Sequence, residues 1–147
     1  MQLDHKEIET LIPHSGAMSL LKAVLKWDSE HIICIANSHR NIHNPLRSEN
    51  ILPSVCGVEY AAQAMAVHGA LSKSDPNEKP RPGYLASINN LEILVSSLDE
   101  IESDLLIEAK LLMKDAEFLI YQFRVFSDDH SYLSGRAIIS MKGKSIN

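Results

Sequence analysis

The sequence has too few of several residue types to belong to some common classes of protein. It contains two cysteines, Cys34 and Cys56; two are too few for a disulfide framework, and neither has a partner at metal-ligand spacing. Long apolar runs are also missing, because no stretch approaches the ~20 residues that span a bilayer. The polar start at residues 4–9 does not resemble a signal peptide. We therefore expect a cytoplasmic protein without a membrane span.

Positive charge is not in excess either. The chain has 14 Lys and Arg against 19 Asp and Glu, a net charge of −5. It has no basic run with interleaved aromatics, which argues against nucleic-acid binding. Aromatic residues make up 5% and include one Trp and three Phe, so few bulky side chains are available to plug an apolar channel. The remaining composition, 45% hydrophobic and 22% charged, is typical of one globular domain over residues 1–147.

A metal centre is not predicted. His39 and His43 lie close together in the sequence, but no acid or cysteine completes a ligand set beside them. No motif indicates an organic cofactor. The sequence therefore predicts neither a metal nor a cofactor.

The pattern of apolar residues predicts one long helix among several strands. Between residues 54 and 71 nearly every residue is small or apolar, and a helix that is apolar on all sides is buried. Four strand-like segments with short links follow, which indicates an antiparallel sheet, with a bend near Asn89-Asn90. The sequence thus predicts an α+β fold in which a curved sheet wraps a central helix.

The first helix and the remaining elements follow from capping and turn residues. Asp4 can cap a short helix, and Glu7 lies three residues further on, as in a capping box. The predicted elements, in order, are a helix at 4–11, strands at 18–27 and 30–37, an irregular stretch at 38–52, the long helix at 54–71, a loop at 72–82, and strands at 83–98, 104–114, 118–126 and 132–141.

Two short segments suggest chemistry. Residues 11–18 contain His14 directly after a proline, and residues 52–63 contain a Pro-Ser start to the long helix, with Glu59 and, one turn later, Gln63. A base and an acid, each alone in apolar sequence, predict proton chemistry on an apolar substrate. Each also has an ordinary explanation, because a histidine after proline is most often a loop residue and a lone buried acid is often structural.

With these segments and this order of elements, the chain resembles the hotdog-fold 3-hydroxyacyl-[acyl-carrier-protein] dehydratases of the FabZ/FabA type. Pro13-His14 is similar to the family's Pro-His segment beside the first strand. Pro53-Ser54-Val55, followed by Glu59 and Gln63, is similar to the start of the family's central helix. The resemblance implies a hotdog fold for nearly the whole chain.

Residues 57–66, with Asn44-Pro45-Leu46-Arg47 upstream, most resemble the ApeP-like branch of this family, which is linked to aryl polyenes and related lipids. The chain departs from the family at two places. Ser54 replaces the glycine at the helix start, which makes the backbone there less permissive. Residues 44–49 replace the usual Gly-His-Phe-Pro approach, a change that concerns substrate shape more than chemistry.

The resemblance implies separate roles in the dehydration of a 3-hydroxyacyl thioester. His14 would take a proton from C2, since histidine titrates near neutral pH. Glu59 would give a proton to the leaving C3 hydroxyl, because burial favours the protonated form of a carboxylic acid. Alternatively, Glu59 would hold a water molecule while His14 shuttles the proton. The backbone N–H groups of Ser54 and Val55, at a helix N-terminus, would stabilise charge on the thioester oxygen.

Further site positions follow from the same resemblance. Gln63 lies on the helix face of Glu59 and is expected to hydrogen-bond into the site. The strand at residues 83–88 resembles the strand that lines the family's substrate tunnel, so Ala86 and Ser87 are expected beside the acyl chain. His14 and Glu59 are implied to meet across a dimer interface.

The resemblance also implies two kinds of partner. One is an acyl carrier protein whose phosphopantetheine arm holds the acyl chain, and the other is a second hotdog chain, identical or different. The basic residues that flank two loops are candidates for contact with an acidic carrier, although a solvated surface explains any one of them. They are Arg40, Arg47, Lys79 and Arg81.

Two other functions stay open at this point. A hotdog acyl thioesterase also uses an acid on the central helix, but it generally does not need the histidine, so His14 argues against it. A non-catalytic subunit of a heterodimeric dehydratase is the second alternative. The presence of both His14 and Glu59 argues against a dead subunit, but not against a heterodimer.

Overall fold

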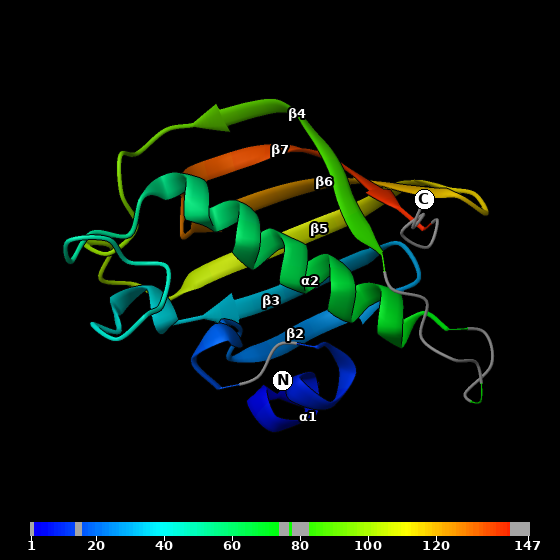
Figure 1. Cartoon of the computed structure of the whole chain (residues 1–147), viewed down its shortest axis with the longest axis horizontal. Coiled ribbons are helices and arrows are strands. Elements are labelled where there is room, and N and C mark those ends of the chain that lie inside the picture. Colours follow the sequence, from blue (N-terminus) through cyan, green and yellow to red (C-terminus); the bar gives the residue numbers. More distant parts are fainter. Residues whose placement is uncertain (1, 14–15, 74–76, 78–82, 142–147) are drawn as a thin grey trace, which may run out of the picture.

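The long helix predicted from the sequence is the centre of the fold. The computed structural model describes residues 2–13, 16–73, 77 and 83–141. In it a 3₁₀ turn at Ser54–Cys56 leads directly into helix α2, Gly57–Leu71, which lies across strands β3, β5 and β6 of a sheet (Figure 1). The predicted span of 54–71 is thereby confirmed.

The sheet is antiparallel and contains seven strands in the order β1-β2-β3-β5-β6-β7-β4. The α+β class predicted from the sequence is confirmed. The strands are β1 (Leu3–Asp4), β2 (Ala23–Asp28), β3 (His31–Ala36), β4 (Tyr84–Ile93), β5 (Leu105–Lys114), β6 (Phe118–Ser127) and β7 (His130–Ser140).

The short N-terminal helix α1, His5–Leu11, has the predicted cap. The N–H of Glu7 donates to Asp4 Oδ1 at 2.9 Å, and the N–H of Asp4 donates to Glu7 Oε1 at 3.3 Å. Because both unpaired donors find carboxylates, the helix can begin without a preceding turn of backbone partners. α1 lies beside β2 at one edge of the sheet (Figure 1).

The first hairpin differs from the prediction at its start. β2 begins at Ala23 and not at residue 18, because residues Gly16–Met18 form a 3₁₀ turn. The peptide groups of Leu20 then bond to the side chains of Gln63 and Ser38 and not to a neighbouring strand. The backbone of Leu20 is therefore bonded to side chains from other segments, and not to the neighbouring strand that the local sequence pattern predicts.

The C-terminal strands largely confirm the predictions. β4 ends at Ile93, five residues before the predicted end at Leu98, and it has a bulge between Asn89 and Glu92. Asn90 has φ of 54°, a left-handed conformation that asparagine tolerates better than most residues. The bend expected near Asn89-Asn90 is thereby confirmed. The loop predicted for 72–82 lies mostly outside the described residues.

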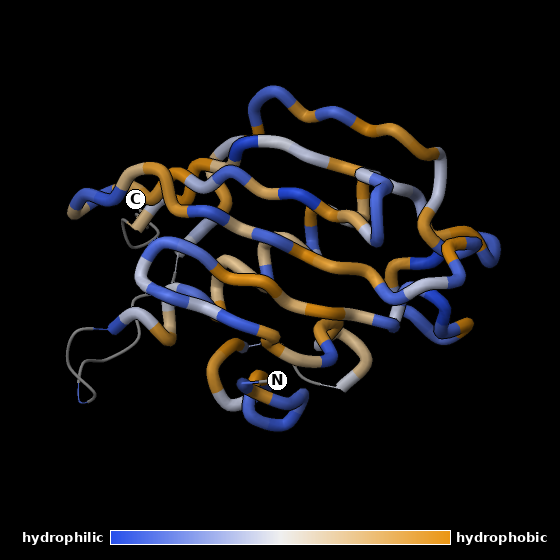
Figure 2. The backbone as a smooth tube through the Cα atoms, turned by 180° about the vertical axis from the view of Figure 1, so that it is seen from behind, coloured by the Kyte–Doolittle hydropathy of each residue, from blue (hydrophilic) through white to orange (hydrophobic). Residues whose placement is uncertain are grey.

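Strand β4 forms one edge of the sheet and is largely exposed along its length. Figure 2 shows hydrophobic stretches along this edge. Large apolar side chains are exposed there, although a strand of a stable monomer usually hides them or replaces them with charge. They are Tyr84, Leu85, Leu91, Ile93 and, just beyond the strand, Leu94.

Helix α2 is not buried on all sides in the single chain, so this prediction is wrong for the chain alone. The buried side of the helix includes Tyr60, Gln63 and His68. Away from it Ala66 and Gly69 are exposed, and Glu59, beside Gln63, is half-buried. The small residues on this face leave the helix open where no element among the described residues covers it. Within those residues, no helix is long and apolar enough to cross a membrane.

Candidate active site

The start of the central helix is anchored to the segment that follows β4. The N–H of Leu98 donates to the carbonyl of Leu52 at 2.8 Å, and the N–H of Leu52 donates to Asp99 Oδ1 at 2.9 Å. The N–H of Ser54 donates to the carbonyl of Ser96 at 3.2 Å. These bonds pair backbone groups that an irregular approach to a helix would otherwise leave unpaired.

The same end of the helix packs closely on the sheet. An added Cβ at Gly57 would lie 2.5 Å from Leu133 Cδ2, so only glycine allows this approach of helix to strand β7. The side chain of Leu133 is buried. Both backbone hydrogen bonds and close packing therefore hold the start of the helix in place. Glu59, two residues after Gly57, extends from this fixed backbone.

Ser54 and Val55, the two residues expected to offer N–H groups to a substrate oxygen, lie in the 3₁₀ turn before α2. The Ser54 N–H is bonded to Ser96, as described above, so a substrate oxygen would have to share or replace this bond. The buried Ser54 Oγ has no hydrogen-bond partner among the described residues. Val55 is 52% exposed, so its position is open to a ligand.

Gln63 joins the carboxyl group of Glu59 to the N-terminal part of the chain. Its Nε2 donates to Glu59 Oε1 at 3.3 Å and to the carbonyl of Met18 at 2.8 Å, and its Oε1 accepts from the N–H of Leu20 at 2.9 Å. The backbone N–H of Leu20 can only donate, so it fixes which end of the amide is oxygen. The Gln63 side chain is fully buried and therefore cannot exchange these partners for water.

His14, the predicted base, lies outside the described residues. Met18, four residues after it, is bonded to Gln63 one turn from Glu59. Gly16, two residues after it, donates its N–H to Glu9 Oε2 at 3.1 Å, which joins this segment to α1. Hydrogen bonds to Gln63 and to Glu9 therefore hold the described part of this segment in place.

Ala86 and Ser87 lie on β4, at the edge of the sheet and not at the start of α2. A register shift in the pairing with β7 falls between Leu85 and Ser87. Ala86 is exposed and Ser87 is half-buried. The structure thus groups Ser54, Val55, Glu59 and Gln63, and it places the two β4 residues on a separate, open strand.

The basic residues considered for carrier contact are already bonded within the chain. Arg40 contacts Asp104 Oδ1 at 2.6 Å and donates to the carbonyl of Glu102 at 2.6 Å. Arg47 donates to the carbonyls of His39 at 2.9 Å and Asn50 at 3.1 Å. Both arginines therefore order the loop before α2. Lys79 and Arg81 lie outside the described residues.

The other reactive groups in the described part of the chain do not complete a second site. Burial raises the pKa of the Cys34 thiol to about 12 and also raises that of Cys56, so neither is a ready thiolate at neutral pH. Among the described residues, no group of three His, Cys, Asp or Glu side chains could hold a metal ion.

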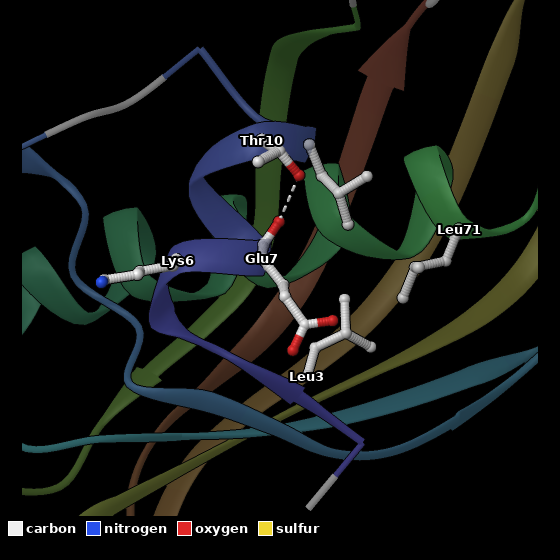
Figure 3. Close-up of a pocket in the computed structure, with 6 residues that line it drawn as sticks. Leu3, Lys6, Glu7, Thr10 and Leu71 are labelled. Atoms are coloured by element: carbon white, nitrogen blue, oxygen red, sulfur yellow. Dashed lines mark hydrogen bonds between the residues drawn. The ribbon is translucent and has the colours of Figure 1, made fainter.

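Two surface depressions lie away from Glu59. One, of about 360 Å³, lies between α1 and the end of α2 (Figure 3) and is lined by Leu3, Lys6, Glu7, Thr10, Leu11 and Leu71. The other, of about 560 Å³, lies along residues 16–22 and 37–41. Neither is lined by Glu59, which lies instead on the partly open face of α2.

Sequence reasoning missed three polar residues beside the site. The hydroxyl of Tyr60, next to Glu59, lies 2.8 Å from Ser38 Oγ and 3.1 Å from Asn44 Nδ2. The apolar surroundings of Tyr60 in the sequence predict a buried residue of the core or of a substrate tunnel, but they do not predict a bonding partner for its hydroxyl. Only the turn-forming character of Asn44, whose Oδ1 accepts from the N–H of Leu46, was a local signal.

A central helix on a wrapped antiparallel sheet, with an acid and an amide one turn apart at its start, defines a hotdog-fold protein. A family model, described as ApeP-like, ApeP dehydratase, matches residues 6–142. The chain therefore belongs to the ApeP-like dehydratase family. No curated protein matches the sequence.

Solved structures agree on the fold. The dehydratase heterocomplex ApeI:P from Xenorhabdus doucetiae matches with a TM-score of 0.81 at 22% identity, covering 93% of this chain and 91% of that one. Thioesterases from Haemophilus influenzae and Pseudomonas aeruginosa match with TM-scores of 0.66 at 13% identity. Each match covers 95% of this chain, and 91% and 94% of the respective thioesterase. Identities this low establish the hotdog fold and not the reaction.

Proposed function

We propose that this dehydratase acts on 3-hydroxyacyl thioesters of acyl carrier protein and forms trans-2-enoyl thioesters, in aryl polyene or fatty acid biosynthesis. The observation that supports it best, beside the family, is the Gln63 side chain. It bonds both the carboxyl group of Glu59 and the backbone of Met18, which connects the segment after His14 to the helix turn that contains the acid.

The reaction needs a base and an acid on one substrate. His14 takes the proton from C2, the electron pair of that bond forms the C2=C3 double bond, and the C3–O bond breaks. Glu59 gives its proton to the leaving hydroxyl, which departs as water. Transfer of the C2 proton from His14 back to Glu59 restores both groups for the next turnover.

Negative charge on the thioester oxygen needs a donor at the start of α2. We assign this role first to the N–H of Val55, because the N–H of Ser54 is already bonded to Ser96. The helix dipole also provides a favourable local field for an anion at this end of α2. Ala86 and Ser87 are assigned to the acyl chain, on the strand that a second chain would approach.

A second hotdog chain, identical or different, is proposed to complete the site. Apolar side chains on the edge strand β4 and the open face of α2 support this, since both would be covered by a partner. The neighbour from Xenorhabdus doucetiae is itself a heterocomplex. A single domain over 1–147, a cytoplasmic location and contact with the phosphopantetheine arm of a carrier stay predictions.

The test is a mass-spectrometric assay of purified protein with a 3-hydroxyacyl group on acyl carrier protein. We expect loss of one water from the acyl chain, and we expect His14→Ala and Glu59→Gln each to lower the rate ~10²–10⁴-fold. Matched controls are His43→Ala and Glu100→Gln, which change exposed residues of the same types and should leave the rate unchanged. Near wild-type turnover in either site variant would contradict the proposed catalytic roles of His14 and Glu59.

Other products separate the alternatives. Release of the free acid would make the protein a thioesterase, the function of several structural neighbours. If no product forms with the chain alone, the assay is repeated with a co-purified second hotdog chain. Dehydration that appears only then identifies a heterodimeric enzyme.

Mixing the two inactive variants tests how the site is divided between chains. The resemblance places His14 and Glu59 on different chains, whereas Gln63 joins Met18 to the helix of its own chain. Co-expressed His14→Ala and Glu59→Gln chains regain activity if each site takes one residue from each chain. They stay inactive if both residues come from the same chain.

A further inference from the structure

Four polar groups near Glu59 form a hydrogen-bond network. Counting the available hydrogens shows which group donates and which accepts in each bond. The carbonyl of Leu20 can only accept, so Ser38 Oγ donates to it at 2.8 Å. The single hydroxyl proton of Ser38 is then used, so Tyr60 must donate to Ser38 Oγ at 2.8 Å. Tyr60 in turn accepts from Asn44 Nδ2 at 3.1 Å. The bonds therefore run from Asn44 through Tyr60 and Ser38 to Leu20.

This network meets the bonds of Gln63 at one residue, Leu20. The N–H of Leu20 donates to Gln63 Oε1, and its carbonyl accepts from Ser38 Oγ. Both backbone groups of Leu20 are thus paired with side chains from other segments, and Tyr60 and Gln63, on either side of it, come from the same turn of α2. Leu20 is buried, so water does not substitute readily for these partners.

Asn44 holds the other end of this hydrogen-bond network. Its second amide hydrogen donates to the carbonyl of Ser38 at 2.9 Å, and its Oδ1 accepts from the N–H of Leu46 at 2.9 Å. Burial raises the pKa of the Tyr60 hydroxyl, so the proton that it donates stays in place at neutral pH. Every polar group of this hydrogen-bond network therefore has a defined partner, and a fully bonded buried network is rigid.

We propose that Tyr60, Ser38 and Asn44 are positioning residues, which hold the Met18–Leu20 segment in register with Glu59 and thereby keep in place the Gln63 amide that bonds both. Tyr60 acts through Ser38 and Leu20 and does not touch the reacting atoms. The catalytic part of this inference rests on the proposed dehydratase function. The structural part, the fixing of Leu20, stands apart from it.

The test compares two tyrosines that lose the same group. Tyr60→Phe removes the hydroxyl beside Glu59, and Tyr121→Phe removes an equally buried hydroxyl that bonds His68 two turns further along α2. We expect Tyr60→Phe to lower kcat at least ~10-fold with KM little changed, since small displacements of reacting groups have large effects on rate. Tyr121→Phe should lose similar thermal stability but keep kcat.

Amide hydrogen exchange measured by NMR tests the structural part without any substrate. In Tyr60→Phe the Leu20 amide should exchange at least ~10-fold faster relative to the Ile107 amide in β5, since local opening is reported by local exchange. In Tyr121→Phe this ratio should not change. Unchanged relative exchange of Leu20 in Tyr60→Phe overturns the inference.

Substitutions at Ser38 test the same proposal if Tyr60→Phe does not fold. Ser38→Ala should reproduce the loss of kcat and the faster exchange of Leu20, and Ser38→Thr, which keeps a hydroxyl, should restore both. If the wild type is active and both Tyr60→Phe and Ser38→Ala keep kcat within ~2-fold, which is ~0.4 kcal/mol in activation free energy, the inference is wrong and the proposed function stands. If the wild type has no dehydratase activity, the catalytic part fails with the proposed function, and exchange decides the structural part.

Discussion

The two ends of helix α2 use buried hydrogen bonds for different purposes. Near the start, Tyr60 and Gln63 bond to irregular backbone at Leu20 and Met18, directly or through Ser38. Near the end, His68 bonds the hydroxyl of Tyr121 in β6 at 2.6 Å and the carbonyl of Asp28, the last residue of β2, at 2.8 Å. The first network organises backbone outside the sheet, and the second closes the helix against regular strands.

Donor counting also orients the second network. The Asp28 carbonyl only accepts, so His68 Nε2 donates to it, and in the neutral imidazole Nδ1 then accepts from the Tyr121 hydroxyl. This arrangement needs the neutral imidazole, and burial lowers the pKa of His68, opposed by its bond to Asp28. The end of the helix thus depends on one protonation state. The start of the helix reaches instead toward a half-buried carboxyl group.

The largest predicted effect breaks the first network. Gln63→Leu removes all three bonds of this amide and leaves the buried N–H of Leu20 without a partner. We expect the free energy of unfolding to fall by about 2–3 kcal/mol, since an unsatisfied buried donor keeps its full desolvation penalty. Urea unfolding measures this. Gln122→Leu, on the exposed side of β6, is the matched control and should change stability by less than about 0.5 kcal/mol.

A pair of glycines tests the packing difference between the two ends. Gly57→Ala places a Cβ 2.5 Å from the buried Leu133, whereas Gly69→Ala meets nothing within 4 Å. We expect Gly57→Ala to lose about 1–3 kcal/mol by overpacking. Gly69→Ala should gain about 0.5–1 kcal/mol through helix propensity. Thermal and urea unfolding of both variants check this, and equal effects at both positions would contradict the proposed asymmetry of the helix.

The smallest predicted effect concerns pH at the second network. The pKa of His68 is lowered in the folded state, so the unfolded state binds the proton more readily below about pH 6.5. Stability should therefore fall as pH decreases through this value, by at most ~1.4 kcal/mol per pH unit from this residue. His68→Gln should remove this part of the slope in urea unfolding between about pH 7.5 and pH 5. His39, whose pKa burial also lowers, should keep a remaining slope, and an unchanged total slope would exclude His68 as the cause.

Much of the fold follows from local sequence, because its rules act within a few residues. The capping box of Asp4 and Glu7, the span of the central helix and the bend at Asn90 were all predicted and are confirmed. The two-residue strand β1 and the late start of β2 were not. Both depend on partners far along the chain, which a local pattern does not contain.

The candidate site divides in the same way. The contact of Glu59 with Gln63 follows from their spacing of one helical turn. The bonds of Gln63 to Met18 and Leu20, and of Tyr60 to Ser38, join residues 22 to 45 positions apart. A buried tyrosine in an apolar helix predicts a place in the core, but its hydroxyl partner is set by how the loop at 38–46 folds back. Long-range topology therefore decided the polar part of the site.

The position of β4 has a consequence for assembly during synthesis. β4 is the fourth strand in the sequence, yet in the sheet it pairs with β7, residues 130–140. Until those residues leave the ribosome, β4 has no strand beside it and the edge that a partner would meet does not exist. The order of synthesis thus leaves β4 unpaired until β7 is made, and during this time its free backbone groups and apolar side chains are open to association with other nascent chains.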